Sequence, residues 1–307
     1  MLILDVGAKY GIHPSFRDIK NLYKFLLVDA DPQEIINLKK LYKKNKNIKC
    51  KNFFFDKKNK DKSVYLNIYK HQGKHSFYEL INEKIQKKLL VPLATIDSIK
   101  EKIVFLKVDV EGKEVDCLLG ATNQLSNNIL GIRCEVLLNP IYKNQTETFS
   151  KVNSILQHFD FEFMNFDILR KTSFKPFYKY YDKDSAVYGK VFAVDGIWVK
   201  KVEKILKSAD AKEILNYVLF CLLNNLTDLA IKILKSKKNL INKSIKKNQI
   251  YKKIFYFIEY RLANIFFYLR KDSLYTKVIE KDFEDIFYKK FPLEGNFFKQ
   301  YTLDFKF

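Results

Sequence analysis

The sequence Leu2-Ile3-Leu4-Asp5-Val6-Gly7-Ala8-Lys9-Tyr10-Gly11 decides the fold at the start of the chain. An apolar run that ends in a carboxylate and a glycine is typical of a buried strand followed by a tight turn. In an open parallel sheet, ligands bind outside the carboxyl ends of the strands, where the strand order reverses. We therefore expect Asp5 and the turn from Gly7 to Gly11 to lie beside a ligand.

Outward from this turn, the apolar pattern alternates between two periods. Short apolar runs predict further strands, and apolar residues three or four apart predict helices. The predicted strands are 24–29, 48–55, 64–69, 103–110, 129–138, 161–169 and 186–200, and the predicted helices are 14–23, 33–43, 114–125 and 146–158. This alternation predicts an α/β fold with a mostly parallel sheet. No clear helix separates the last strands, so we expect an antiparallel edge.

The pattern changes after residue 200. Helical spacing without strand signals covers 203–223, 227–234, 248–269 and 274–291. We therefore predict an α/β domain over residues 1–200 and an all-helical extension over residues 201–307. Apolar stripes in the extension predict a bundle docked on the first domain. The alternative is that its lysines and aromatic residues rest on an anionic membrane, near lipid-linked glycan substrates.

The net charge of +21 raises the possibility of a nucleic-acid partner. Nearly all of this charge is lysine, whereas base readers and phosphate clamps favour the forked guanidinium of arginine. A nucleic-acid partner is therefore disfavoured. A solvated lysine-rich surface is the simplest explanation, and an anionic membrane or an acidic substrate are the alternatives.

The cysteines and the apolar segments bear on location. The four cysteines form no CxxC pair, and three of them lie in apolar segments, which favours buried thiols in a reducing cytoplasm. Residues 1–5 have the wrong length and charge for a signal peptide. Glu259 and Arg261 interrupt the apolar stretch 254–269, so no membrane span is expected. We expect a cytoplasmic protein, with contact to the inner face of the membrane as the alternative.

The first turn favours one cofactor over another. Its glycine spacing differs from the GxGxxG fingerprint of dinucleotide-binding proteins. A carboxylate at Asp5 repels a pyrophosphate but suits a ligand that carries an ammonium and a sulfonium. We therefore predict S-adenosylmethionine rather than NAD, bound by Asp5, Gly7, Ala8 and Gly11.

A second acidic position follows eighteen residues after Gly11, at the end of the second predicted strand. Asp29 is placed to accept hydrogen bonds from both ribose hydroxyls of the cofactor. Asp31 directly precedes Pro32, so it is better explained as a helix cap.

These motifs, with two more along the chain, resemble the FkbM-type methyltransferase family. The matching segments are 5–8 with 11–14, 28–32, 93–99, 106–114 with 118–121, and Glu135 with 140–142. Asp29-Ala30 stands where the family usually has Glu-Pro, which keeps the carboxylate. The family generally carries residues before its first strand, and here Met1 nearly begins it, which predicts a less covered cofactor pocket.

The resemblance covers residues 1–200 and leaves the helical extension outside it. It implies a Rossmann-like class I methyltransferase fold and, usually, O-methylation of a hydroxyl on a sugar, glycan precursor or related small molecule. A nucleic-acid methyltransferase is an alternative, although the chain lacks an Asn-Pro-Pro-Tyr-like motif. A non-catalytic module that retains the fold is the other alternative.

Two carboxylates are the predicted catalytic residues. Asp109 ends the fourth buried strand at the same crevice, where it could orient the acceptor, act as a base or bind a metal. Glu135 ends the fifth strand, where an unpaired carboxylate would be costly, so it either contacts substrate or holds neighbouring loops.

The histidines give weaker candidates. His71 and His75 have the spacing of a metal pair on a helix, but Gly73 argues against a helix there. We predict no metal site, and we keep His75 as a possible base and His13 as a residue of the cofactor turn.

Overall fold

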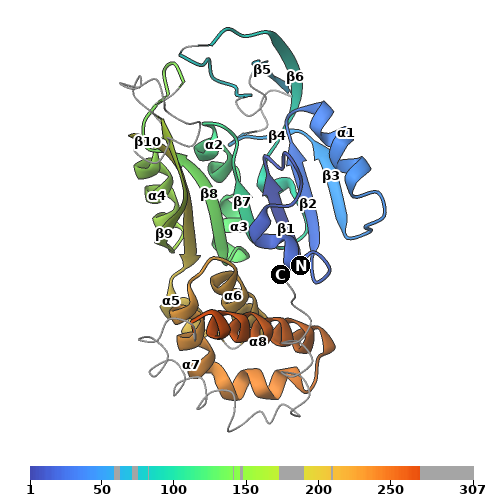
Figure 1. Cartoon of the computed structure of the whole chain (residues 1–307), viewed down its shortest axis with the longest axis vertical. Helices are drawn as coiled ribbons and strands as arrows, with labels where there is room; N and C mark the ends of the chain where they lie inside the picture. The colour runs from blue at the N-terminus through green and yellow to red at the C-terminus, as the bar shows by residue number, and fades with distance from the viewer. Residues whose placement is uncertain are drawn as a thin grey trace.

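The computed structural model describes residues 1–58, 63–70, 75–81, 83–140, 142–145, 148–172, 190–208 and 210–269. Its main element is a seven-stranded sheet in the order β3-β2-β1-β7-β8-β10-β9 (Figure 1). The strands are β1 (Leu2–Val6), β2 (Lys24–Asp29), β3 (Ile48–Asn52), β7 (Ile103–Val108), β8 (Gly131–Leu137), β9 (Phe161–Thr172) and β10 (Lys190–Lys200). β3, β2, β1, β7 and β8 run parallel to one another, and β10 runs antiparallel to both β8 and β9. The predicted α/β fold with an antiparallel edge is confirmed.

The strand order reverses at β1. The chain moves outward from β1 to β2 and β3, and it returns to the other side of β1 as β7. Both neighbours are parallel to β1, so three carboxyl ends meet at one edge of the sheet. A ligand site is expected there because the connections leave these strands in opposite directions.

Several element boundaries differ from the prediction. The strand predicted over 48–55 breaks at Phe53 into β3 and the short β4 (Phe54–Phe55), which joins a separate sheet in the order β4-β6-β5. The strand predicted over 64–69 is β5 (Ser63–Ile68), and it pairs with β6 (Lys87–Ala94), which the sequence analysis missed. The predicted helix 14–23 is only a 3-10 helix, η1 (Pro14–Ile19).

The sheet is covered by helices on both faces. Side chains alternate along β1, so Leu4 packs on one face and Ile3 on the other. The face of Leu4 is covered by α2 (Glu114–Leu119), α3 (Thr122–Asn127) and α4 (Phe149–His158). The helix predicted over 114–125 is therefore two helices, and the predicted helix 146–158 is shorter. The face of Ile3 is covered by η1, by α1 (Pro32–Leu41) and by helices that follow the sheet.

The region after residue 200 is helical over its described part, as predicted. Its helices are α5 (Val202–Lys207), α6 (Ala211–Leu223), α7 (Thr227–Ile245) and α8 (Gln249–Leu269). α7 is longer than predicted, and the predicted helix 274–291 lies outside the described residues. α6 packs directly on the sheet: a Cβ atom at Gly131 would meet the Phe220 ring at 2.3 Å. Tyr217 also donates a hydrogen bond to the Lys200 carbonyl at 2.9 Å. Because η1 is short, α6 of the extension covers part of the sheet face on which Ile3 lies.

Two further expectations concern the cysteines and the membrane. All four cysteines are free, and Cys117, Cys134 and Cys221 are buried. Over the described ranges, the structure has no helix with the length and apolar character needed to cross a bilayer.

Candidate functional site

A cavity of about 380 Å³ opens at the carboxyl ends of β1, β2 and β7. This volume lies within the range of small-molecule sites in proteins. Four of the five residues predicted to bind the cofactor line it, namely Asp5, Gly7, Gly11 and Asp29. The fifth, Ala8, is buried in the core and donates its backbone N–H to the Val28 carbonyl at 3.0 Å.

Gly7 is required by a close approach of backbone. It has φ +72°, and a Cβ atom there would lie 1.7 Å from the Asp109 carbonyl oxygen. The first turn and the loop after β7 therefore touch, and no larger residue fits between them. Gly11 also adopts the left-handed region, with φ +108°. The glycines thus shape the cavity floor.

Asp5 is fully buried and holds the first turn in place. Its Oδ2 accepts a hydrogen bond from the His13 backbone N–H at 2.9 Å. The other oxygen, Oδ1, lies 3.4 Å from Lys107 Nζ but has no hydrogen-bond partner among the described residues. Burial raises the pKa of Asp5. A buried acceptor with an unused lone pair beside a cavity suits a ligand that donates hydrogen bonds from a cation.

Asp31 takes the helix-cap role predicted for it, whereas the predicted contact of Asp29 with ribose stays a prediction. Asp31 caps α1 by accepting the Gln33 N–H at 2.9 Å, which confirms its role as a helix cap. Asp29 uses Oδ1 to accept the Asp31 N–H at 2.9 Å, and it faces the cavity. Burial raises the pKa of Asp29 to about 6. Phe53 and Phe77 line the cavity wall nearby and add apolar surface.

Lys107 lies between the end of the cavity that holds Asp5 and the end that holds Asp109. Its buried ammonium donates to the carbonyls of Val6 at 3.2 Å and Gly7 at 2.8 Å. It also lies 3.4 Å from Asp5 and 3.5 Å from Asp109. Burial alone would lower the pKa of Lys107, but the charges of Asp109 and Asp5 outweigh it and raise the pKa. Lys107 is therefore charged and compensates both carboxylates.

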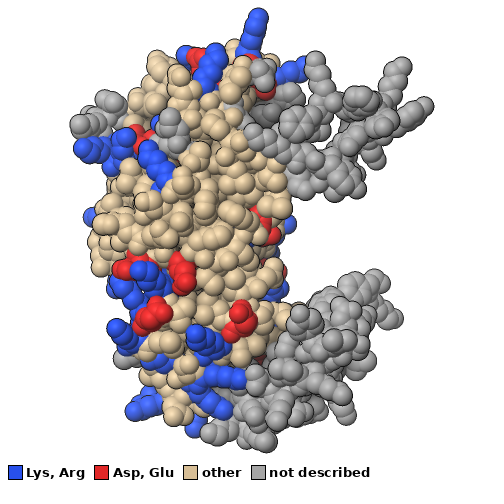
Figure 2. All heavy atoms as spheres, turned by 90° about the vertical axis from the view of Figure 1, so that its left-hand side faces the viewer, with Lys and Arg blue, Asp and Glu red and all other residues tan. Residues whose placement is uncertain are grey.

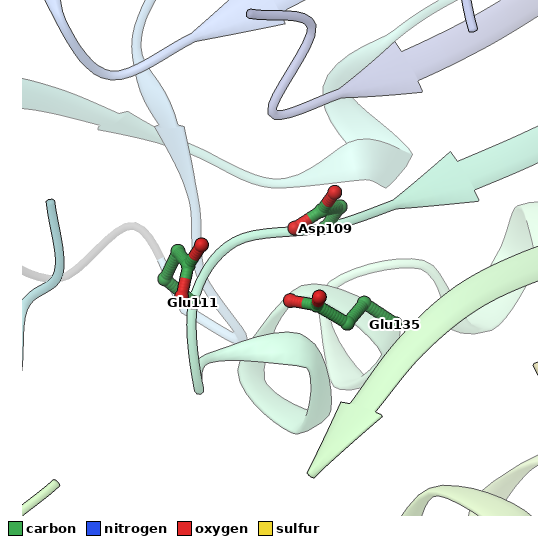
Figure 3. Close-up of side chains that lie close together, drawn as sticks. All are labelled: Asp109, Glu111 and Glu135. Atoms are coloured by element: carbon green, nitrogen blue, oxygen red, sulfur yellow. The ribbon is translucent and has the colours of Figure 1, made fainter. Parts of the chain in front are cut away.

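Asp109, just after β7, and Glu135, near the end of β8, lie close together (Figure 3), and each shifts the pKa of the other. Burial would raise the pKa of Asp109, but Lys107, the hydrogen bond from Glu135 and Arg170 hold it below its ordinary value. Burial and the charge of Asp109 raise the pKa of Glu135 well above its ordinary value, although Arg170 favours its ionised form. Asp109 is thus the ionised partner and Glu135 the proton donor. Asp109 lines the cavity, whereas Glu135 is buried behind it.

Glu111 is a third carboxylate at this end. Its backbone has φ +55°, and its Oε2 accepts a hydrogen bond from the Tyr142 hydroxyl at 2.6 Å. Burial and the charge of Asp109 raise the pKa of Glu111 to about 8. The start of α2 is occupied by Glu114, which accepts the N–H groups of Val110 and Gly112. Glu111 instead lines the cavity.

Oxygens of Asp109, Glu111 and Glu135 lie within 4.8 Å of one another. Sets of carboxylates at such separations can bind divalent cations. In this structure, Lys107 and Arg170 already supply positive charge to the set, since Arg170 lies 2.8 Å from Glu135. That the chain binds no metal remains a prediction.

A buried charge network extends from this end toward the helical extension. Arg170 on β9 bonds both Glu135 at 2.8 Å and Asp195 at 2.7 Å. Arg133 on β8 bonds the other Asp195 oxygen at 3.1 Å and donates to Asn224, just after α6, at 3.0 Å. Side chains on β8 and β10 therefore fix the orientation of Arg170, and Asn224 acts on it only through Arg133 and Asp195.

The two described candidate histidines line the cavity without forming a metal pair. Burial, and then the charge of Arg133, lower the pKa of His13 to about 3, so it is neutral. His75 accepts the Tyr69 N–H at Nδ1, 3.3 Å away, and its Nε2 lies 3.9 Å from Asp31. Burial lowers the pKa of His75. His71, its proposed metal partner, lies outside the described residues.

The sequence analysis did not assign roles to Lys107 or Arg170. A charged residue inside the apolar run 103–108 is a usable signal, because a buried lysine needs acidic partners. Arg170 gave no such signal, since it follows a predicted strand whose neighbours were unknown.

Comparisons with known proteins identify a family for this chain. The family described as methyltransferase FkbM domain matches residues 5–163, slightly more than half of the chain. No curated protein matches the sequence.

Three solved structures are similar to parts of this chain. An FkbM methyltransferase from Methylobacillus flagellatus is 14% identical with a TM-score of 0.37, over 63% of this chain and 43% of that one. A TehB-like SAM-dependent methyltransferase from Corynebacterium glutamicum is 12% identical with a TM-score of 0.31, over 65% and 80%. A Streptococcus pneumoniae protein assigned to tRNA (m1A22) methylation is 10% identical with a TM-score of 0.33, over 85% and 92%. These values carry no information about the substrate of this chain.

Proposed function

Because this chain belongs to the FkbM methyltransferase family, we propose that it transfers a methyl group from S-adenosylmethionine to a hydroxyl of a sugar, glycan precursor or related small molecule. The observation that carries the proposal is the placement of one ionised carboxylate, Asp109, in a cavity whose other end offers Asp5 and Asp29. One end thus suits a cationic cofactor, and the other suits an acceptor that must lose a proton.

The residues at the first turn fit this cofactor. The unused Oδ1 of Asp5 suits its ammonium group, and Asp29 suits two ribose hydroxyls. Phe53 and Phe77 offer apolar surface for a base. When bound, the cofactor supplies an electrophilic methyl group, and the protein supplies alignment and control of protons.

The acceptor end suits a neutral polyhydroxyl molecule. Asp109 accepts a hydrogen bond from the acceptor hydroxyl and takes its proton as the methyl group is transferred. Glu135 donates a hydrogen bond to Asp109 from behind, which orients the carboxylate. Protonated Glu111 can donate to a second hydroxyl. An anionic acceptor would face the charge of Asp109, which disfavours phosphates and supports hydroxyl groups.

The test separates cofactor binding from transfer. In calorimetry, Asp29→Ala should weaken S-adenosylmethionine binding by about 1.5–3 kcal/mol, because it removes a charge-assisted site. Asp18→Ala, an exposed aspartate outside the cavity, is the matched control. Unchanged affinity in Asp29→Ala would falsify the cofactor assignment.

Transfer is tested by a methyl-transfer screen on free sugars, glycan precursors and tRNA. We expect a sugar-type hydroxyl to be methylated, with Asp109→Asn folded, able to bind the cofactor and at least about a hundredfold slower. Methylation of tRNA alone, or an Asp109→Asn rate equal to wild type, would refute the acceptor assignment.

A further inference from the structure

The helical extension carries an uneven charge distribution. Nine lysines and no acidic residue lie between Asp228 and Glu259. This stretch forms most of α7, the connection to α8 and the first half of α8. In the view of Figure 2, Lys and Arg side chains gather over the lower part of the molecule, where the extension lies, while the middle of that face carries few charges.

The helical period brings these lysines to one surface. Lys232 and Lys243 are eleven residues apart on α7, and Lys246, the C-cap residue, follows three residues later with helical backbone. The three therefore lie on one side, and all are exposed. Lys247 in the connection and Lys253 on α8 are exposed as well. Lys237, in contrast, is turned inward and donates to the Ser208 carbonyl.

Exposed apolar side chains accompany this charge. Ile250, in the first turn of α8, is 55% exposed, and Tyr256 is 42% exposed. The Lys252 ammonium lies 5.6 Å from the centre of the Tyr256 ring. We call this surface the hairpin patch, made of Lys243, Lys246, Lys247, Ile250, Lys252, Lys253 and Tyr256.

We propose that the hairpin patch binds the surface of an anionic lipid bilayer. Clustered lysines gain attraction from anionic headgroups without needing directed hydrogen bonds. An isoleucine and a tyrosine at the same place gain from insertion into the interfacial zone. A nucleic-acid partner is less well matched, because the patch has no arginine for bidentate phosphate or base contacts.

The position of the patch has a consequence for substrate access. α7 and α8 lie at the end of the sheet opposite to the carboxyl ends of β1 and β7 (Figure 1). A bilayer at the hairpin patch therefore leaves the cavity facing away from the membrane. This placement argues against an acceptor anchored in the same bilayer, and an acceptor would reach the cavity from solution.

The full chain is tested for co-sedimentation with vesicles of phosphatidylcholine containing phosphatidylglycerol. Binding is expected at low salt and should fall as salt is raised. The charge-reversal variant K243E/K246E/K247E/K253E should bind at least about a hundredfold more weakly, given roughly fivefold per lysine. Ile250→Ser should weaken binding by roughly fivefold because it removes the inserted side chain.

Matched controls come from exposed positions on the α/β domain, outside the hairpin patch. K43E/K44E/K46E/K49E changes the same charge at exposed positions around the start of β3, and Ile36→Ser replaces an isoleucine that is 59% exposed on α1. Both should retain binding within about threefold. Absence of wild-type binding, equal losses in patch and control variants, or binding to single-stranded RNA without vesicle binding would each overturn the proposal. Because every changed residue is exposed, circular dichroism should show the same fold for all variants.

Discussion

The two ends of the cavity hold their carboxylates in different ways. At the end that holds Asp5 and Asp29, which we call the first-turn end, the carboxylates accept hydrogen bonds from backbone N–H groups of nearby residues. His13 donates to Asp5, and Asp31 donates to Asp29. At the acceptor end, distant side chains hold the carboxylates: Glu135 hydrogen-bonds Asp109, and Arg170 bonds Glu135. Local backbone contacts fix the positions of Asp5 and Asp29, whereas a side-chain network favours ionisation of Asp109 over Glu135.

Lys107 belongs to both ends, so its loss should have the largest effect. Lys107→Met removes the nearest cation from buried Asp5 and partly buried Asp109, which should cost about 3–5 kcal/mol of unfolding free energy near neutral pH. The cost should shrink at about pH 4, because both carboxylates then escape by protonation. Urea denaturation at the two pH values measures it.

Lys102→Met is the matched control, because Lys102 is exposed just before the same strand. It should change the unfolding free energy by less than about 0.5 kcal/mol. If Lys107→Met changes the unfolding free energy no more than the control does, the Lys107 ammonium does not stabilise the carboxylates at the two ends.

Arg170 contacts carboxylates only at the acceptor end of the cavity. Its loss should therefore affect that end and leave cofactor binding at the first-turn end unchanged. Arg170→Met should lower the unfolding free energy by about 1–3 kcal/mol, because Glu135 and Asp195 lose a charged partner. Cofactor affinity, measured by calorimetry, should change by less than about threefold. Arg261→Met is the control, since Arg261 makes a single ion pair to exposed Asp18, and it should cost about 0–1 kcal/mol. A large loss of cofactor affinity in Arg170→Met would contradict the division.

The smallest expected effect is the pH dependence of the first-turn end. The pKa of Asp29 is raised to about 6 by burial, so the folded state holds a proton that the unfolded state has lost. This group therefore destabilises the fold as pH rises from about 4 to about 6, and the Asp29→Asn profile should be flatter. Cofactor affinity should rise over the same range, because the ionised carboxylate is the better acceptor for ribose hydroxyls. If cofactor affinity rises equally with pH in Asp29→Asn, the group that titrates is not Asp29.

The sequence by itself determined the α/β sheet, its antiparallel edge and the main features of the first-turn end. Apolar runs and their period define strands and helices locally, and the segment 5–11 carries its turn in its own glycines. The cap at Asp31 follows the same logic, because its hydrogen bond reaches only two residues ahead. Contacts between residues so close in sequence depend little on the rest of the chain.

The side-chain contacts at the acceptor end, and the packing of α6 on one face of the sheet, depend on the tertiary structure. Arg170 reaches Glu135 from a strand that enters the sheet later, and Tyr142 reaches Glu111 from a distant loop. Phe220 packs on Gly131 because the short η1 leaves that face open. Strand pairing and helix docking place these residues together, and no local pattern specifies which distant side chain compensates a buried charge or covers an open face.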